Sequence, residues 1–127
     1  MLKRIHHIAI ICADYERSKA FYVDILGLDI IQETYRAERD SYKLDLGLNG
    51  DYIIELFSFS NPPKRASRPE ATGLRHLAFE VDDIEQQVKV LIEKRILIEP
   101  IRIDENTHKK FTFFSDPDGL PIELYEN

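Results

Sequence analysis

The feature that most constrains the fold of this chain is an internal repeat, because the second half of the sequence resembles the first. The segment 7–14 aligns with 76–83 at an offset of 69 residues, with His, Ala and Asp at matching positions. A second match places 53–57 over 121–125 at an offset of 68. Two matches in nearly the same register are hard to obtain by chance. The sequence therefore predicts two modules built on one plan.

Each half has the pattern of a strand, a helix and three further strands. In the first half, Asp14 is expected to cap the helix and Gly27 to end it. In the second half, the helix is expected to start after Asp83 and to turn Val88, Leu91 and Ile92 inward. The expected strands are 5–12, 28–35, 42–48 and 52–59, followed by 74–81, 98–103, 110–114 and 120–125. The prediction is an α+β fold of two βαβββ modules in tandem.

We expect residues 1–127 to form a single domain, with module 1 at about 1–59, a linker at about 60–73 and module 2 at about 74–127. The linker contains Pro62, Pro63 and Pro69 together with three cations. It is either a plain connection or a functional loop whose cations meet an anionic substrate, and the sequence leaves both open.

The amino-acid composition limits the kinds of molecule that this protein is expected to bind. The chain has 127 residues, 43% of them hydrophobic and 31% charged, with a net charge of -6, which argues against a nucleic-acid footprint. No apolar run approaches the roughly 20 residues that span a bilayer. The single cysteine, Cys12, excludes a disulfide scaffold and a Cys-rich zinc site. We expect a cytoplasmic protein that acts on a small molecule.

Strand alternation places four polar residues on equivalent faces. Ile54 and Leu56, like Ile122 and Leu124, form the set that packs on the helix, which leaves Glu55 and Glu123 on the other face. By the same alternation, His7 and His76 share that face. If the halves form one cup-shaped curved sheet with the helices outside, two His and two Glu converge on its concave side.

Two imidazoles and two carboxylates suit a borderline divalent cation such as Ni, Co, Zn, Mn or Fe. Four protein ligands leave open positions for water or substrate, which is typical of a catalytic site. Each residue alone has an ordinary alternative, since a strand His is usually only hydrogen-bonded and a strand Glu usually faces solvent. Their repeated placement favours the metal site.

The order His7, Glu55, His76 and Glu123 resembles the vicinal oxygen chelate superfamily, and within it the glyoxalase I-like proteins. The helix start at 18–22, the helix exit at 25–28 and the turn at 116–119 also match. The resemblance implies a cup around one divalent metal ion bound by these four residues. It further implies a homodimer, in which the site is often completed by both chains.

The resemblance also implies a metal-dependent lyase or isomerase of the glyoxalase I type. In such enzymes the metal chelates two neighbouring substrate oxygens, and a Glu removes a proton beside a carbonyl. Glu123 and Glu55 are both candidate catalytic bases. Ile11 and Phe59 occupy the positions where glyoxalase I anchors glutathione, so we do not expect specificity for glutathione.

Three alternatives stay open: a dioxygenase or a thiol transferase of the same superfamily, or a metal-free protein that sequesters a drug. The first two use three protein ligands, so an acid at position 55 favours the four-ligand type. Phe57, Tyr125 and either Phe113 or Phe114 are expected near the site. Other polar residues are expected to have structural roles: His6 lies on the helix side or at an edge, His108 in solvent, and Cys12 is a buried thiol. Four cations are expected to be surface charges or contacts to an anionic substrate tail: Arg36, Arg39, Lys43 and Arg75.

Overall fold

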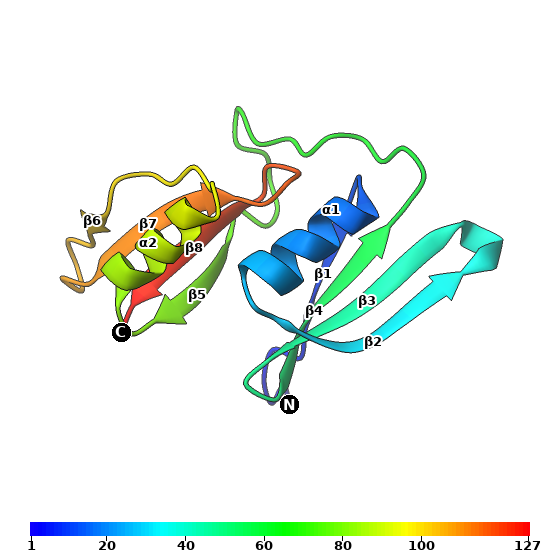
Figure 1. The fold of residues 1–127 in the computed structure, drawn as a ribbon, viewed down its shortest axis with the longest axis horizontal. Helices are drawn as coiled ribbons and strands as arrows, with labels where there is room; N and C mark the ends of the chain where they lie inside the picture. The colour runs from blue at the N-terminus through cyan, green and yellow to red at the C-terminus, as the bar shows by residue number, and fades with distance from the viewer. The chain divides into compact units, whose positions relative to one another are not determined.

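The computed structural model describes residues 1–127 and divides into two compact units, Met1–Lys64 and Arg65–Asn127 (Figure 1). Unit 1 contains β1 (Ile8–Cys12), α1 (Tyr15–Ala20), a π-helical turn (Phe21–Ile25), β2 (Asp29–Arg36), a 3-10 turn (Ala37–Arg39), β3 (Ser41–Leu48) and β4 (Asp51–Ser58). Unit 2 contains β5 (Leu77–Val81), α2 (Ile84–Glu93), β6 (Arg102–Ile103), β7 (Lys110–Ser115) and β8 (Pro121–Glu126).

The two units share one topology. The strand order is β1-β4-β3-β2 in unit 1 and β5-β8-β7-β6 in unit 2. In each, the first strand runs parallel to the last, and the other neighbours are antiparallel. Because the connections and pairings match strand for strand, the predicted α+β fold of two βαβββ modules is confirmed.

The core of unit 1 lies between its sheet and α1. Leu44, Leu46 and Ile54 are fully buried, as predicted for Ile54 from strand alternation. Tyr15 of α1 stacks on Tyr42 of β3 with ring centroids 4.2 Å apart, which places the helix on this face. The opposite side of the sheet is called its open face below.

The helix of unit 1 ends before Gly27 as predicted, but its last turn, Phe21–Ile25, is π-helical rather than α-helical. The backbone widens after α1, and Leu26 donates to the carbonyl of Phe21 five residues earlier. The wide turn accommodates an extra residue, so that Phe21 and Tyr22 are both buried. Gly27 then takes a φ of 80°, which confirms the predicted left-handed stop.

The core of unit 2 repeats this arrangement. Ile84 and Leu91 of α2 and Ile122 of β8 are fully buried, and Asp83 caps the helix by accepting from the backbone of Gln86 at 3.0 Å. The prediction for Ile92 is wrong, since it is 58% exposed. It lies one helical position beyond Leu91, at the edge of the contact with the sheet.

Three predicted strands are shorter than expected, and one of them is β5, which begins at Leu77 rather than Leu74. β1 begins at Ile8 rather than Ile5, because its pairing with β4 begins at Ile54. β6 contains only Arg102–Ile103 instead of 98–103. Pro100 lies inside the predicted strand and has no backbone N–H to contribute to a ladder.

The connection between β4 and β5 has no helix or strand. Its Arg65 donates to the carbonyls of Leu74 and Arg75 at 2.8 and 3.0 Å, so this cation is bound within the segment.

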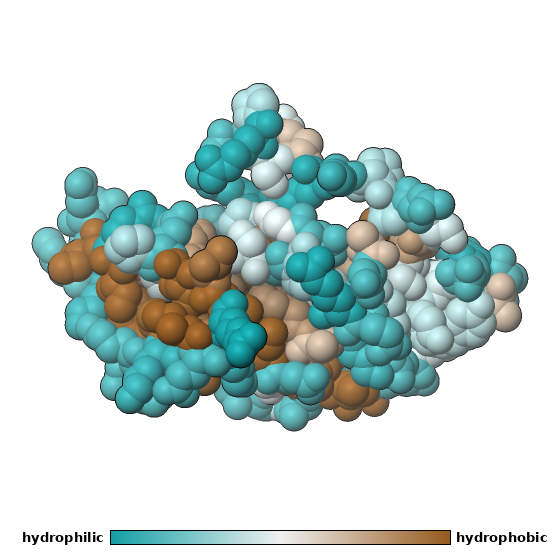
Figure 2. Space-filling view, turned by 45° about the horizontal axis from the view of Figure 1, so that its top comes forward, coloured by the Kyte–Doolittle hydropathy of each residue, from teal (hydrophilic) through white to brown (hydrophobic).

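Neither helix is long and apolar enough to cross a membrane. Hydrophobic residues gather on the surface of unit 2 in Figure 2, and Leu97 is 93% exposed.

Candidate metal centre

Unit 1 brings together its predicted ligands, His7 and Glu55. Nε2 of His7 lies 3.9 Å from Oε1 of Glu55, and the two side chains are 35% and 16% exposed. Glu55 lies on the open face of β4, where its register partner on β1 is Ala9. The small Ala side chain leaves room above the sheet for the imidazole that precedes it by two residues.

Unit 2 repeats this construction with His76 and Glu123. Nε2 of His76 lies 3.0 Å from Oε2 of Glu123, and the register partner of Glu123 is Ala78. Phe113 packs against the imidazole with ring centroids 5.1 Å apart. Phe114, the other aromatic candidate, is buried on the helix side. Each unit therefore carries one half of the predicted ligand set.

The donor atoms of both pairs suit a divalent metal ion, and the spacing of the second pair suits it as well, whereas the 3.9 Å of the first pair is wider. Two donors that bind one ion at about 2.1 Å and at right angles to each other lie about 3.0 Å apart, which is the separation in the second pair. Nδ1 of His7 contacts Nδ1 of His6 at 2.9 Å, so its Nε2 is the nitrogen that faces the carboxylate. Nδ1 of His76 is buried without a hydrogen-bond partner. Both pairs thus present an imidazole nitrogen beside a carboxylate oxygen.

A charged network surrounds the first pair. The hydroxyl of Tyr52 lies 2.7 Å from Asp45 and 3.1 Å from Glu55, and Nζ of Lys43 lies 3.3 Å and 3.4 Å from the same two carboxylates. Burial and these hydrogen bonds raise the pKa of Tyr52 well above its ordinary value. Burial alone would lower the pKa of Lys43, but its attraction to Asp45 and Glu55 raises it overall.

The second pair has an aromatic setting and is about as buried as the first, with the side chain of Glu123 14% exposed. Glu123 lines a cavity of about 410 Å³ within unit 2, together with Phe111, Arg102 and neighbouring polar residues. This volume falls within the usual range for small-molecule sites. The guanidinium of Arg102 lies 4.9 Å from the centroid of Phe111. Glu123 is therefore accessible to a small molecule from this cavity.

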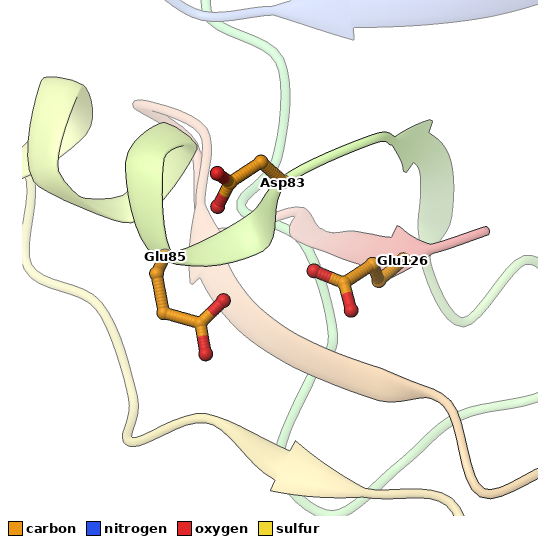
Figure 3. Close-up of side chains that lie close together, drawn as sticks. All are labelled: Asp83, Glu85 and Glu126. Carbon is orange, nitrogen blue, oxygen red and sulfur yellow. The ribbon is translucent and has the colours of Figure 1, made fainter.

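A separate acidic cluster lies at the start of α2 (Figure 3). Carboxylate oxygens of Asp83, Glu85 and Glu126 lie within 4.8 Å of one another. Asp83 and Glu126 accept hydrogen bonds from backbone N–H groups in the first turn, and Glu85 pairs with Lys110 at 2.6 Å. The hydrogen bond from Lys110 lowers the pKa of Glu85. Helix capping by Asp83 and Glu126 and the ion pair of Glu85 with Lys110 account for this cluster.

Three residues near the first pair were not identified from the sequence. His6 was expected on the helix side or an edge, but it lies against His7 and Tyr52. Strand alternation fails for it because β1 begins only at Ile8. Asp45 could have been placed from its strand face, which it shares with Lys43. Tyr52 could not, because its odd spacing from Glu55 predicts the opposite face and only the register shift near Gly47 changes this.

Comparison with known proteins finds relatives that match almost the whole chain. The protein YwkD of Bacillus subtilis (strain 168) is 68% identical over 126 residues, which covers 99% of this chain and 98% of YwkD. The crystal structure of the glyoxalase family protein from Enterococcus faecalis is 49% identical, covers 98% of both chains and has a TM-score of 0.90.

More distant relatives have names that describe reactions. The metallothiol transferase FosB of Staphylococcus haemolyticus is 32% identical over 98% of this chain and 84% of FosB. The mitochondrial methylmalonyl-CoA epimerase of Bos taurus is 28% identical over 97% of this chain and 74% of that protein. The family model described as Glyoxalase/Bleomycin resistance protein/Dioxygenase superfamily matches residues 4–124. This chain belongs to that superfamily.

Proposed function

We propose that His7, Glu55, His76 and Glu123 together hold one divalent metal ion, with Ni, Co, Zn, Mn and Fe as the candidate metals. The observation that carries the proposal is that the two pairs are built in the same way. In each, the Glu is the register partner of an Ala on the neighbouring strand, and the His lies two residues before that Ala. The two pairs meet either within one chain or across a homodimer.

The proposed activity is that of a metal-dependent lyase or isomerase that moves a proton beside a substrate carbonyl. A bound divalent ion supplies Lewis-acid stabilisation of negative charge on a substrate oxygen. The epimerase among the relatives supports this reaction class. The extra carboxylate at position 55 favours it over the transferase alternative suggested by FosB.

Glu123 is our candidate for the base that takes the proton. It lines the cavity of unit 2, and its one contact with a charged or hydrogen-bonding group is with His76. Glu55 is engaged on both oxygens, because Oε1 faces His7 while Oε2 contacts Tyr52 and Lys43. A base needs an accessible lone pair within reach of the substrate, which favours Glu123. Glu55 then serves as a fixed ligand.

Hydrogen–deuterium exchange next to a carbonyl tests this function. Metal-loaded protein in deuterated water is incubated with a panel of acyl thioesters and α-hydroxy ketones, and exchange is followed by NMR. We expect metal-dependent exchange in at least one compound class, lost after chelation. Absence of exchange throughout the panel, combined with metal-dependent addition of a thiol to an epoxide, would establish the transferase alternative instead.

We further propose that the protein works in the cytoplasm as a homodimer. The single chain leaves large apolar side chains exposed, including Leu97 and Ile103, which supports association. Light scattering after gel filtration is expected to give twice the mass of 14.9 kDa. A monomeric mass at micromolar concentration would contradict the dimer.

The hemithioacetal of methylglyoxal and glutathione is expected to be a poor substrate. Ile11 and Phe59, which are 56% and 36% exposed, offer no charged or hydrogen-bonding side chain to the ends of glutathione. Burying a polar group without a partner costs about 1 to 3 kcal/mol, so burying both ends of glutathione against these residues would reduce kcat/KM by roughly 30-fold or more. A steady-state assay with Ni- and Zn-loaded protein checks this, and the efficiency of an ordinary glyoxalase I would contradict it.

A further inference from the structure

Glu55 lies beside a second carboxylate, that of Asp45, and one lysine contacts both of them. Asp45 lies directly opposite Glu55 in the register of β3 and β4, and its side chain is only 9% exposed. Like charges in opposed positions destabilise a sheet, and a buried carboxylate is costly unless it is paired. Lys43 offsets only one of the two negative charges, since its Nζ lies 3.3 Å from Asp45 and 3.4 Å from Glu55.

The second unit acts as an internal control for this argument. Where β3 has Lys43 and Asp45, β7 has Phe111 and Phe113, and Phe113 is the register partner of Glu123. The same topology thus forms with two aromatic residues in the equivalent positions. It follows that the βαβββ plan does not require the charged residues of unit 1.

Tyr52 contacts both members of the first pair. Its ring lies 4.9 Å from the ring of His7, and its hydroxyl lies 3.1 Å from Oε2 of Glu55. The hydroxyl is also fixed by Asp45 at 2.7 Å, and Nζ of Lys43 lies 3.4 Å from the same Oε2. One carboxylate oxygen of Glu55 is thereby occupied, while Oε1 faces His7.

We propose that Tyr52 is a positioning residue for Glu55, with Asp45 holding its hydroxyl in place and Lys43 contacting both carboxylates. This inference rests on the proposed function, since it takes Glu55 to be a metal ligand. With Oε2 held by Tyr52 and Lys43, Glu55 presents Oε1 to the metal as a one-oxygen ligand. Residues that orient a ligand in this way contribute about 10- to 100-fold to metal affinity.

Tyr52→Phe tests the role of the hydroxyl because it keeps the ring that packs on His7. Calorimetric titration with Ni²⁺ is expected to show about 10- to 100-fold weaker binding. The absorption spectrum of the Co²⁺ form should change as well. The matched control is Tyr42→Phe, which removes a hydroxyl on the helix side of the same unit, where Tyr42 stacks on Tyr15. It should bind both metals like the unmodified chain.

A double-mutant cycle separates positioning from a general structural effect. In a Glu55→Gln background, Tyr52→Phe should cause no further loss of Ni²⁺ affinity. An equal loss in both backgrounds, or binding by Tyr52→Phe that matches Tyr42→Phe, overturns the positioning role and leaves the proposed function standing. Failure of the unmodified chain to bind any of the candidate metals overturns the proposed function and this inference with it.

Discussion

His76→Ala is expected to reduce metal affinity by more than about 100-fold, since even residues that only support a ligand contribute 10- to 100-fold. The substitution removes the only imidazole that contacts Glu123, at 3.0 Å. The fold should survive, because the side chain of His76 is 30% exposed and its buried Nδ1 has no hydrogen-bond partner to lose. Equilibrium dialysis followed by elemental analysis measures the retained metal.

The control for this experiment is His108→Asn. His108 is exposed and has a φ of 61°, a backbone conformation that Asn tolerates better than most residues. We expect His108→Asn to retain the full metal content, and the metal-free forms of both variants to unfold cooperatively. Stoichiometric metal in His76→Ala would remove this residue from the site.

Glu123→Gln should lower turnover by about 10² to 10⁴-fold at saturating metal, which is the usual contribution of a general base. The amide keeps the shape of the side chain but loses both its negative charge and its basicity. Glu55→Gln should instead act mainly on metal affinity, with turnover at saturating metal within about tenfold of the unmodified chain. The substrate for both assays is the compound class that shows exchange in deuterated water.

Glu80→Gln is the matched control for these substitutions. Glu80 lies on β5 two residues beyond Ala78, so it shares the open face but is exposed and outside both pairs. Its amide variant should turn over substrate at the unmodified rate. If Glu55→Gln abolishes turnover at saturating metal while Glu123→Gln retains it, the two glutamates exchange roles.

The sequence predicted the faces of the strands well because period-two alternation depends only on local backbone geometry. Ile54, Leu56, Ile122 and Leu124 are all buried as expected, which leaves Glu55 on the open face of its sheet. The repeat supplied information that the pattern of a single strand does not contain, since it identified equivalent positions in the two halves. The composition of both His–Glu pairs followed from these two signals.

The surroundings of the pairs were harder to predict, because they depend on contacts between strands. The position of His6 could not be read from alternation once the strand began at Ile8. The partnership of Asp45 with Glu55 requires the register of β3 against β4, which contains a shift at Leu46 and Gly47. Sequence periodicity carries no information about such a shift.

The stoichiometry of metal binding distinguishes one four-ligand site from two separate His–Glu sites. A four-ligand site predicts that calorimetric titration with Ni²⁺ gives one tightly bound ion per chain. It also predicts that His7→Ala and His76→Ala, one in each module, each abolish tight binding on their own. Two independent ions per chain, or one tight ion that remains after either substitution, would contradict a single site built from both His–Glu pairs.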